Sequence, residues 1–266
     1  MLTYVDVHAH LTHEAFAADR AEVAQRAADA GLEAVIVNGL EPTSNREVLR
    51  LAETYQHVQA ACGIYPVDAI ASRIDDSNWT YDFEPPTPFD VDAEIDWIDA
   101  NADKLVAIGE CGLDQYWITD QAAEQERVLG RLCEVAKKHD KPVILHTRKA
   151  ELRAFEILQE LSVIKADFHC YGGKLKLAKR IAEAGYYLSI PPVVERAESF
   201  QQIARTLPLD RLLTETDCPY MGPDRDARNE PANVTRGIAA MAKARGISVE
   251  EMAKAVRDNC RRLFGV

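Results

Sequence analysis

Residues 121–146, QAAEQERVLGRLCEVAKKHDKPVILH, contain a predicted helix followed directly by a predicted strand. The helix is expected over 121–139, because apolar residues recur there at helical spacing and share one face: Val128, Leu129, Leu132, Val135 and Ala136. Pro142 then opens a strand over 143–146, a short run of branched apolar residues that ends in His146. This helix and strand set the pattern that the rest of the chain repeats.

The same alternation extends in both directions along the chain. Short apolar runs predict eight strands, over residues 4–8, 34–38, 58–63, 105–109, 143–146, 166–169, 186–190 and 211–214. Further helices are expected over residues 19–30, 175–184, 232–244 and 249–264, and an irregular loop over 75–92. Eight strands, each followed by a helix, favour the α/β class and a TIM-like (β/α)₈ barrel, with one domain over residues 1–266. If one strand is miscounted, a doubly wound open sheet is the alternative.

Composition restricts the class of protein. The 266 residues are 47% hydrophobic and 28% charged, as expected of a folded soluble chain. A formal net charge of −12 argues against a basic surface that binds nucleic acid non-specifically, although bound metal ions can still attract phosphate. No run reaches the roughly 18 to 20 apolar residues of a membrane span, and the start of the chain does not resemble a signal peptide. We therefore expect a cytoplasmic protein without membrane contact.

Imidazole and carboxylate side chains follow five of the predicted strands at their carboxyl ends. They are His8 and His10 after the first strand, Glu110 after the fourth, His146 and His169 after the fifth and sixth, and Asp217 after the eighth. Each alone has an ordinary explanation, such as a loop histidine or a helix-capping aspartate. In a barrel, however, these strand ends meet on one face, where catalytic groups collect. Their coincidence predicts a metal site.

The chemistry of these side chains indicates hard or borderline divalent ions. Imidazole and carboxylate ligands suit Mg²⁺, Mn²⁺ and Zn²⁺ and do not separate them. His8, His10 and Asp217 are placed to hold one ion, and the remaining two histidines the other, with Glu110 between them. Two such ions would lower the pKa of a shared water and bind both the attacking and the leaving oxygen. Asp217 could also orient the attacking hydroxide and later return a proton, so Asp217 and Glu110 are the predicted catalytic residues.

Six cysteines are scattered along the chain without a CxxC pair, which argues against a structural zinc site or a redox centre. Three of them, Cys111, Cys170 and Cys218, directly follow a proposed ligand. Strand alternation should turn them away from the site, so we interpret them as packing residues. A soft-metal centre that uses them is the alternative.

Six segments resemble the TatD family of metal-dependent nucleases, within the amidohydrolase-like barrel superfamily. They span nearly the whole chain: DVHAHL at 6–11, GECGLD at 109–114, PVILHTR at 142–148, FHCYGG at 168–173, LTETDCPY at 213–220 and NEPANV at 229–234. The resemblance implies a TIM barrel, divalent metal at the six residues named above, and hydrolysis of DNA, typically from the 3′ end of single strands. Residues 189–192, Ser-Ile-Pro-Pro, look like an archaeal-type branch of the family.

The chain departs from the family pattern at two places. Where the family often has Gly-x-His-Pro, residues 63–66 read Gly-Ile-Tyr-Pro, and the Tyr65 phenol cannot act as a neutral imidazole would. Lys174 replaces the usual small residue after Gly-Gly. We expect Lys174 and Arg148 to supply positive charge for a phosphate, with two solvated side chains as the alternative. Tyr65, Arg148 and Lys174 are thus the predicted substrate-binding residues.

Other functions fit the same ligands, because a fold does not fix a substrate. The metal-bound water could deacylate mischarged aminoacyl-tRNA or hydrolyse another ester or amide. Classical amidohydrolases of this architecture often bridge their metals with a carboxylated lysine, whereas Glu110 occupies that strand here, which favours the nuclease. A third possibility is a non-catalytic binding protein, against which the presence of every proposed ligand argues.

Overall fold

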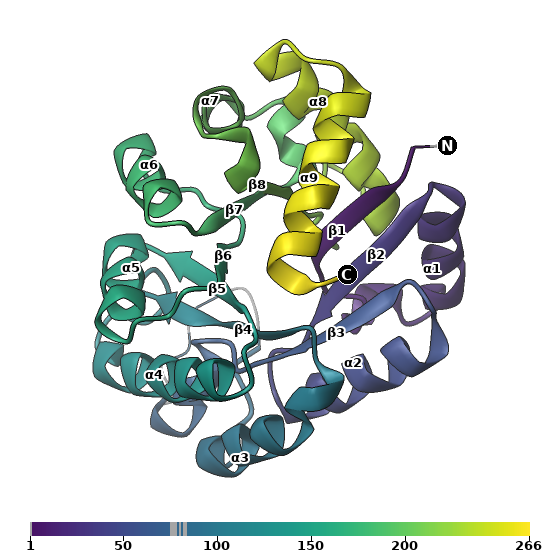
Figure 1. Ribbon diagram of the computed structural model, residues 1–266. Helices are drawn as coiled ribbons and strands as arrows, with labels where there is room; N and C mark the ends of the chain where they lie inside the picture. Colours follow the sequence, from purple (N-terminus) through teal and green to yellow (C-terminus); the bar gives the residue numbers. More distant parts are fainter. Residues whose placement is uncertain (1, 75–78, 80, 82–83) are drawn as a thin grey trace.

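The structure is a computed structural model that describes residues 2–74, 79, 81 and 84–266. One parallel sheet contains eight strands in the same order as in the chain, with helices around its outside (Figure 1). The strands are β1 (Tyr4–Ala9), β2 (Leu32–Asn38), β3 (Val58–Cys62), β4 (Ala107–Asp114), β5 (Val143–Arg148), β6 (Ala166–Phe168), β7 (Tyr187–Ile190) and β8 (Leu212–Thr214). The predicted (β/α)₈ barrel is therefore confirmed, and the doubly wound sheet is not found.

The helices occupy the predicted intervals between strands. They are α1 (Arg20–Asp29), α2 (Pro42–Thr54), α3 (Val91–Asn101), α4 (Ala122–Lys138), α5 (Glu151–Glu160), α6 (Leu175–Glu183), α7 (Glu198–Thr206), α8 (Val234–Arg245) and α9 (Val249–Phe264). The predicted helix at 232–244 begins later, at Val234, because Pro231–Asn233 form a short 3₁₀ turn first. The predicted loop at 75–92 lies partly outside the described residues, and its last two residues belong to α3. None of the helices in the described part of the chain combines the length and apolar character of a membrane span.

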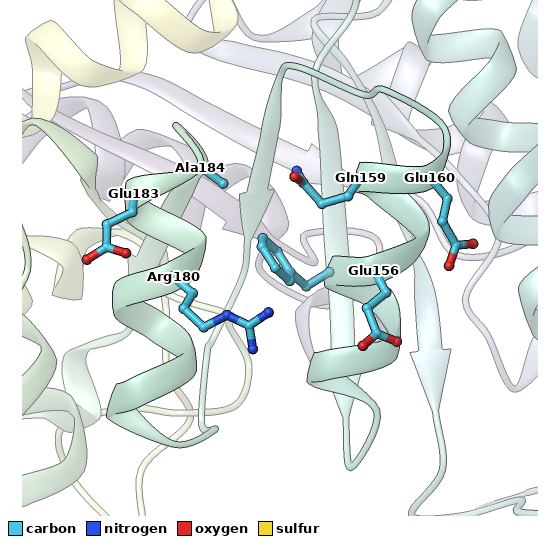
Figure 2. Close-up of a pocket in the computed structure, with 7 residues that line it drawn as sticks. Glu156, Gln159, Glu160, Arg180, Glu183 and Ala184 are labelled. Carbon is cyan, nitrogen blue, oxygen red and sulfur yellow. The ribbon is translucent and has the colours of Figure 1, made fainter.

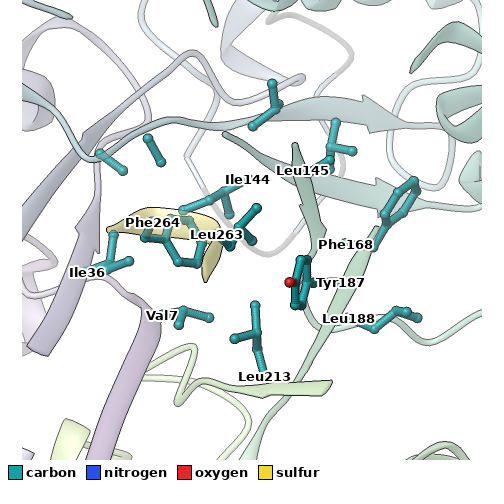
Figure 3. Packing of buried hydrophobic residues seen from close by; sticks show 14 of the residues in the cluster. Val7, Ile36, Ile144, Leu145, Phe168, Tyr187, Leu188, Leu213, Leu263 and Phe264 are labelled. Atoms are coloured by element: carbon teal, nitrogen blue, oxygen red, sulfur yellow. The ribbon is translucent and has the colours of Figure 1, made fainter. Parts of the chain in front are cut away.

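Helix α9 closes one end of the barrel. It lies across the strands in Figure 1, and its Leu263 and Phe264 pack beside Val7 and Ile36 in Figure 3. The Asn259 amide donates to the carbonyl of Leu212, where β8 begins, at 2.7 Å. Because α9 covers the ends at which the strands begin, the opposite, carboxyl ends are left for the loops that carry function.

Two strands extend beyond the sequence prediction. The predicted fourth strand ended at residue 109, but β4 continues to Asp114 and pairs with β5 as far as Arg148. The apolar run that predicted this strand stops before Glu110, so the predicted strand stopped there too. Gly112 allows β4 to pass close to β5, since it has φ of +150° and a Cβ there would collide with the His146 carbonyl. Glu110 therefore lies within β4 and not after it, and His146, predicted to end its strand, is followed by two more strand residues.

Strands β1 and β8 close the barrel without a regular ladder in the described residues. Side-chain hydrogen bonds and two backbone hydrogen bonds join them instead. The Thr214 hydroxyl donates to the Val5 carbonyl at 3.0 Å, and the Thr216 amide donates to the Asp6 carboxylate at 2.8 Å. Directly after these contacts, the Asp217 amide donates to the carbonyl of His8 at 2.8 Å. We call this junction, formed by residues 5–10 and 214–218, the β1–β8 seam.

Candidate metal centre

The six predicted ligands converge at the carboxyl end of the barrel. His8 lies in β1 and His10 follows it, Glu110 lies in β4, His146 lies in β5, His169 follows β6 directly, and Asp217 follows β8. Donor atoms of five of them form two overlapping groups, His8 with His10 and Asp217, and His8 with Glu110 and His169, each within 4.8 Å. His146 belongs to neither group and reaches the centre through Glu110. Residues separated by more than 200 positions thus meet in one small volume.

The seam supplies the first group. The Nε2 atoms of His8 and His10 lie 3.0 Å apart. Asp217 Oδ1 lies 3.9 Å from the first of these nitrogens and 3.5 Å from the second. Oε2 of Glu110 approaches the same two nitrogens at 3.2 and 3.4 Å. Two imidazole nitrogens and two carboxylate oxygens therefore face a common point.

The other oxygen of Glu110 faces the second pair of histidines. Its Oε1 lies 3.0 Å from Nδ1 of His146 and 3.1 Å from Nε2 of His169. The ring of His169 stacks on that of His8, with the centroids 3.8 Å apart. The Glu110 carboxylate thus stands between the two groups and turns one oxygen toward each.

This set of donors fits divalent cations. Four imidazole nitrogens lie within 3.4 Å of the two Glu110 oxygens. Nε2 of His8 and Nε2 of His10 also face each other, so at most one of them can donate to the other. The remaining lone pairs point inward at a buried carboxylate, an arrangement that a cation between them would satisfy. Both groups contain only nitrogen and oxygen donors, and the thiol of Cys111 lies against the Ile144 carbonyl.

The electrostatics of the centre favour a charged carboxylate among partly protonated imidazoles. Burial opposes ionisation of Glu110, but the charges of His169 and His8 outweigh it and hold the pKa of the carboxyl well below its usual value. Burial disfavours protonated His169 too, yet Glu110 and Glu215 raise its pKa well above the usual range. Burial and His169 lower the pKa of His8. A cation would therefore meet a neutral His8 and displace a proton from His169.

Carboxylates outside the ligand set orient two of the histidines. Asp114 Oδ2 lies 3.0 Å from Nε2 of His146, and Glu215 Oε2 lies 3.6 Å from Nδ1 of His169. An acceptor on the outer nitrogen leaves the lone pair of the inner nitrogen for a metal. Sequence reasoning did not find either residue. Asp114 lies four residues after Glu110 in β4, and side chains an even number of residues apart point to the same side of a strand. A correct strand length would therefore have placed both on one side. Glu215 lies beyond the end of β8, where alternation gives no signal.

Two of the three predicted substrate-binding residues lie at the centre. The Tyr65 hydroxyl is 3.4 Å from Asp114 Oδ2, and its ring meets His146 edge-on at 4.9 Å. Burial and the charge of Glu110 raise the pKa of Tyr65 well above its usual value, so the phenol stays neutral and can donate a hydrogen bond. Arg148 ends β5 beside these residues. Lys174 is exposed just before α6, and in the described part of the chain no hydrogen bond or ion pair ties its side chain to the centre.

A separate open groove of about 570 Å³ lies on the outside of the barrel between α5 and α6. Figure 2 shows the groove with Arg180 pointing across it toward α5. Its lining consists of Phe155, Glu156, Gln159, Glu160, Arg180, Glu183 and Ala184. None of the converging histidines and carboxylates contributes to it.

Comparison with known proteins identifies relatives along the whole length of the chain. The chain matches the family model described as "TatD related DNase" over residues 5–265. It is 32% identical to human "Deoxyribonuclease TATDN3" over 98% of this chain and 94% of that protein. It is also 32% identical to the "Uncharacterized metal-dependent hydrolase YabD" of Bacillus subtilis, over 98% of each. The crystal structure of YJJV, a TatD homologue from Escherichia coli, superposes with a TM-score of 0.85 at 29% identity, covering 99% of this chain and 98% of that one.

Proposed function

Since the chain belongs to the TatD-related DNase family and is a metal-dependent hydrolase, we propose that it is a 3′–5′ exodeoxyribonuclease that cuts single-stranded DNA with two divalent ions. The position of Glu110 carries this proposal. One of its oxygens lies 3.2 Å from a His8 nitrogen, and the other lies 3.0 Å from a His146 nitrogen. A carboxylate that faces two separate groups of donors is what a bridging ligand requires.

We assign the ligands to the two proposed ions as follows, and the distances to Glu110 support the division. His8, His10 and Asp217 would hold one ion. His146 and His169 would hold the other, with Glu110 shared. When bound, Mg²⁺, Mn²⁺ or Zn²⁺ supplies an activated water and positive charge at the phosphate.

Asp217 is suited to handle the proton of the attacking water. Its side chain is 14% exposed, so it borders the space open to substrate. Burial opposes its ionisation, but the hydrogen bond from His10 and the charge of His169 lower the pKa of the carboxyl. An ionised Asp217 can accept a hydrogen bond from water, orient it and return a proton to the leaving oxygen.

The substrate contacts follow from the cations and the phenol near the mouth. Arg148 and Lys174 would bind phosphate oxygens, and the neutral Tyr65 phenol would donate to one of them or to water. Six free cysteines suit the reducing cytoplasm, where we place the protein. We further propose that residues 1–266 act as one domain, and the archaeal-type branch suggested by residues 189–192 stays a prediction.

The test uses short single-stranded DNA labelled at either the 5′ or the 3′ end, with Mg²⁺ or Mn²⁺. We expect 5′-labelled DNA to shorten stepwise, and EDTA and Glu110→Ala to abolish the reaction. Glu183→Ala, an exposed glutamate in the groove between α5 and α6, is the matched control and should act as wild type. Internal cuts would contradict the exonuclease mode. Inactivity on DNA together with hydrolysis of aminoacyl esters would favour the alternative function.

The role of Lys174 has its own test. The charge on this side chain should attract the phosphate without taking part in bond cleavage, so Lys174→Ala should raise KM and leave kcat nearly unchanged. An unchanged KM would remove Lys174 from the substrate-binding residues. Lys179→Ala, a change at another exposed lysine on α6, is the control for general loss of positive charge.

A further inference from the structure

An aromatic cluster lies beside the metal centre, where β4 and β5 end. Tyr116 and Trp117 follow β4, with their rings nearly perpendicular and 4.7 Å apart. Arg148, the last residue of β5, places its guanidinium carbon 3.7 Å above the Tyr116 ring. Tyr116 is 48% exposed, and it is one of only four large apolar side chains that are exposed in the described part of the chain. An aromatic ring this accessible, with a cation on it, contributes little to the core.

Asp114 fixes this cluster to the metal centre. One of its oxygens accepts hydrogen bonds from the amides of Tyr116 and Trp117 at 2.8 and 3.0 Å. The other lies 3.0 Å from Nε2 of His146. The side-chain amide of buried Gln125 accepts a hydrogen bond from the Asp114 amide at 2.9 Å and donates one to the Asp114 carbonyl at 3.1 Å. A single carboxylate therefore sets both the direction of a proposed metal ligand and the start of the aromatic cluster.

The charge of the Arg148 guanidinium in this cluster is available to a substrate. Among the residues that the structure describes, no carboxylate forms an ion pair with Arg148, whereas Arg153 on α5 pairs with Glu126 at 2.8 Å. Arg148 also lies close to the centre along the chain, since it ends β5 two residues after His146. A guanidinium that stacks on a ring beside a phosphate site can bind the phosphate, while a nucleobase stacks on the ring.

We propose that the Tyr116 ring, with Arg148 stacked on it, is a platform on which the nucleobase next to the cleaved phosphate stacks. This inference rests on the proposed nuclease function and names how the same site recognises its substrate. Stacking requires an unpaired base, so the platform favours single strands over duplex DNA. Every base has a π-face, so the preference should tolerate sequence.

The test compares Tyr116→Ala and Tyr116→Phe with Ile164→Ala, a control that changes an exposed apolar side chain before β6, at the opposite end of the barrel. Binding is measured with single-stranded DNA that carries 2-aminopurine at the terminal base and a phosphorothioate at the last linkage to slow cleavage. We expect wild-type protein to quench the 2-aminopurine fluorescence. Tyr116→Ala should weaken binding and raise KM roughly 5- to 100-fold, with a much smaller change in kcat. Tyr116→Phe should restore both, because it keeps the ring.

A substrate without the stacked base provides a second measurement that needs no variant. Wild-type protein should bind DNA that is abasic at the terminal position as weakly as Tyr116→Ala binds normal DNA, and the two proteins should bind abasic DNA equally. If wild-type protein cuts DNA and Tyr116→Ala has the same KM, the platform is wrong and the nuclease stands. If wild-type protein neither binds nor cuts single-stranded DNA, both proposals fail together.

Discussion

The two sides of the metal centre are held by different kinds of structure. On the β4–β5 side, Glu110 and His146 lie inside a parallel ladder that runs on to Asp114 and Arg148. On the side of the β1–β8 seam, no ladder joins the strands within the described residues, and side chains connect them together with two backbone hydrogen bonds. A ladder positions residues through many backbone hydrogen bonds, whereas the seam relies on a few polar groups.

Asp6 is the central group of the seam. Its buried carboxylate accepts hydrogen bonds from the amides of His8 and Thr216 and from the Thr216 hydroxyl. Burial raises the pKa of Asp6 to about 8, although these hydrogen bonds oppose the rise. The seam therefore depends on one polar group in an unfavourable environment. We expect changes there to cost stability, and changes on the β4–β5 side to alter metal binding more than folding.

The largest effect should come from Asp217, the proposed catalytic ligand in the seam. Asp217→Asn removes a negative ligand and the acceptor for the attacking water, so we expect kcat/KM to fall about 10³-fold or more. The fold should persist, because the hydrogen bond from Asp217 to His8 uses the backbone amide. Steady-state kinetics and circular dichroism measure the two properties. Asp210→Asn, at the opposite end of β8, is the control, and a loss below tenfold would contradict the role of Asp217.

Loss of the seam carboxylate should give the largest change in stability. Asp6→Ala leaves three buried donors without an acceptor and should lower the free energy of unfolding by about 3 kcal/mol or more. Asp114→Ala also removes an acceptor of several hydrogen bonds, but beside an intact ladder, so we expect a smaller loss. Thermal unfolding in EDTA compares the two variants, and equal losses would remove the distinction between the two sides.

Much of this centre is predictable from the sequence, for a physical reason. The ligands follow apolar runs whose strand character is local, and barrel geometry brings their ends together. The seam is not predictable in this way, because Asp6 and Thr216 lie 210 residues apart and nothing local pairs them. Asp114 was missed because the apolar run that predicted β4 stops at residue 109, whereas β4 continues past Gly112, which allows it to approach His146.

On the β4–β5 side, the orienting carboxylate offers a finer test. Asp114→Asn keeps an acceptor for the amides of Tyr116 and Trp117 but loses the charge beside His146. We expect metal affinity to fall roughly 10- to 100-fold, with activity recovered at high metal concentration. Calorimetric titration with Mn²⁺ measures this change, and Asp120→Asn, an exposed aspartate in the same loop, is the control. Unchanged affinity would show that Asp114 does not orient a metal ligand.

The smallest effect is the dependence of stability on pH, to which a group on each side of the centre contributes. Burial opposes protonation of His146, but Asp114 and Glu110 raise its pKa, so its stabilising contribution is full below pH 6.5 and is lost as pH rises through the raised value. Asp6, with a pKa of about 8 against 3.8, retains a proton in the folded state over that interval, so its contribution also falls as pH rises.

Without metal, the free energy of unfolding should therefore decrease from pH 6 to pH 8, by at most about 1.4 kcal/mol per pH unit for each proton involved, and the melting temperature should fall with it. The increase in melting temperature on adding Mn²⁺ should grow over the same interval, because the metal needs deprotonated histidines. Asp6→Asn removes the contribution of the seam to this slope, and His146→Gln removes that of the ladder side. If both variants keep the full wild-type slope in EDTA, these protons are not held by the centre. If only one flattens it, that side holds them.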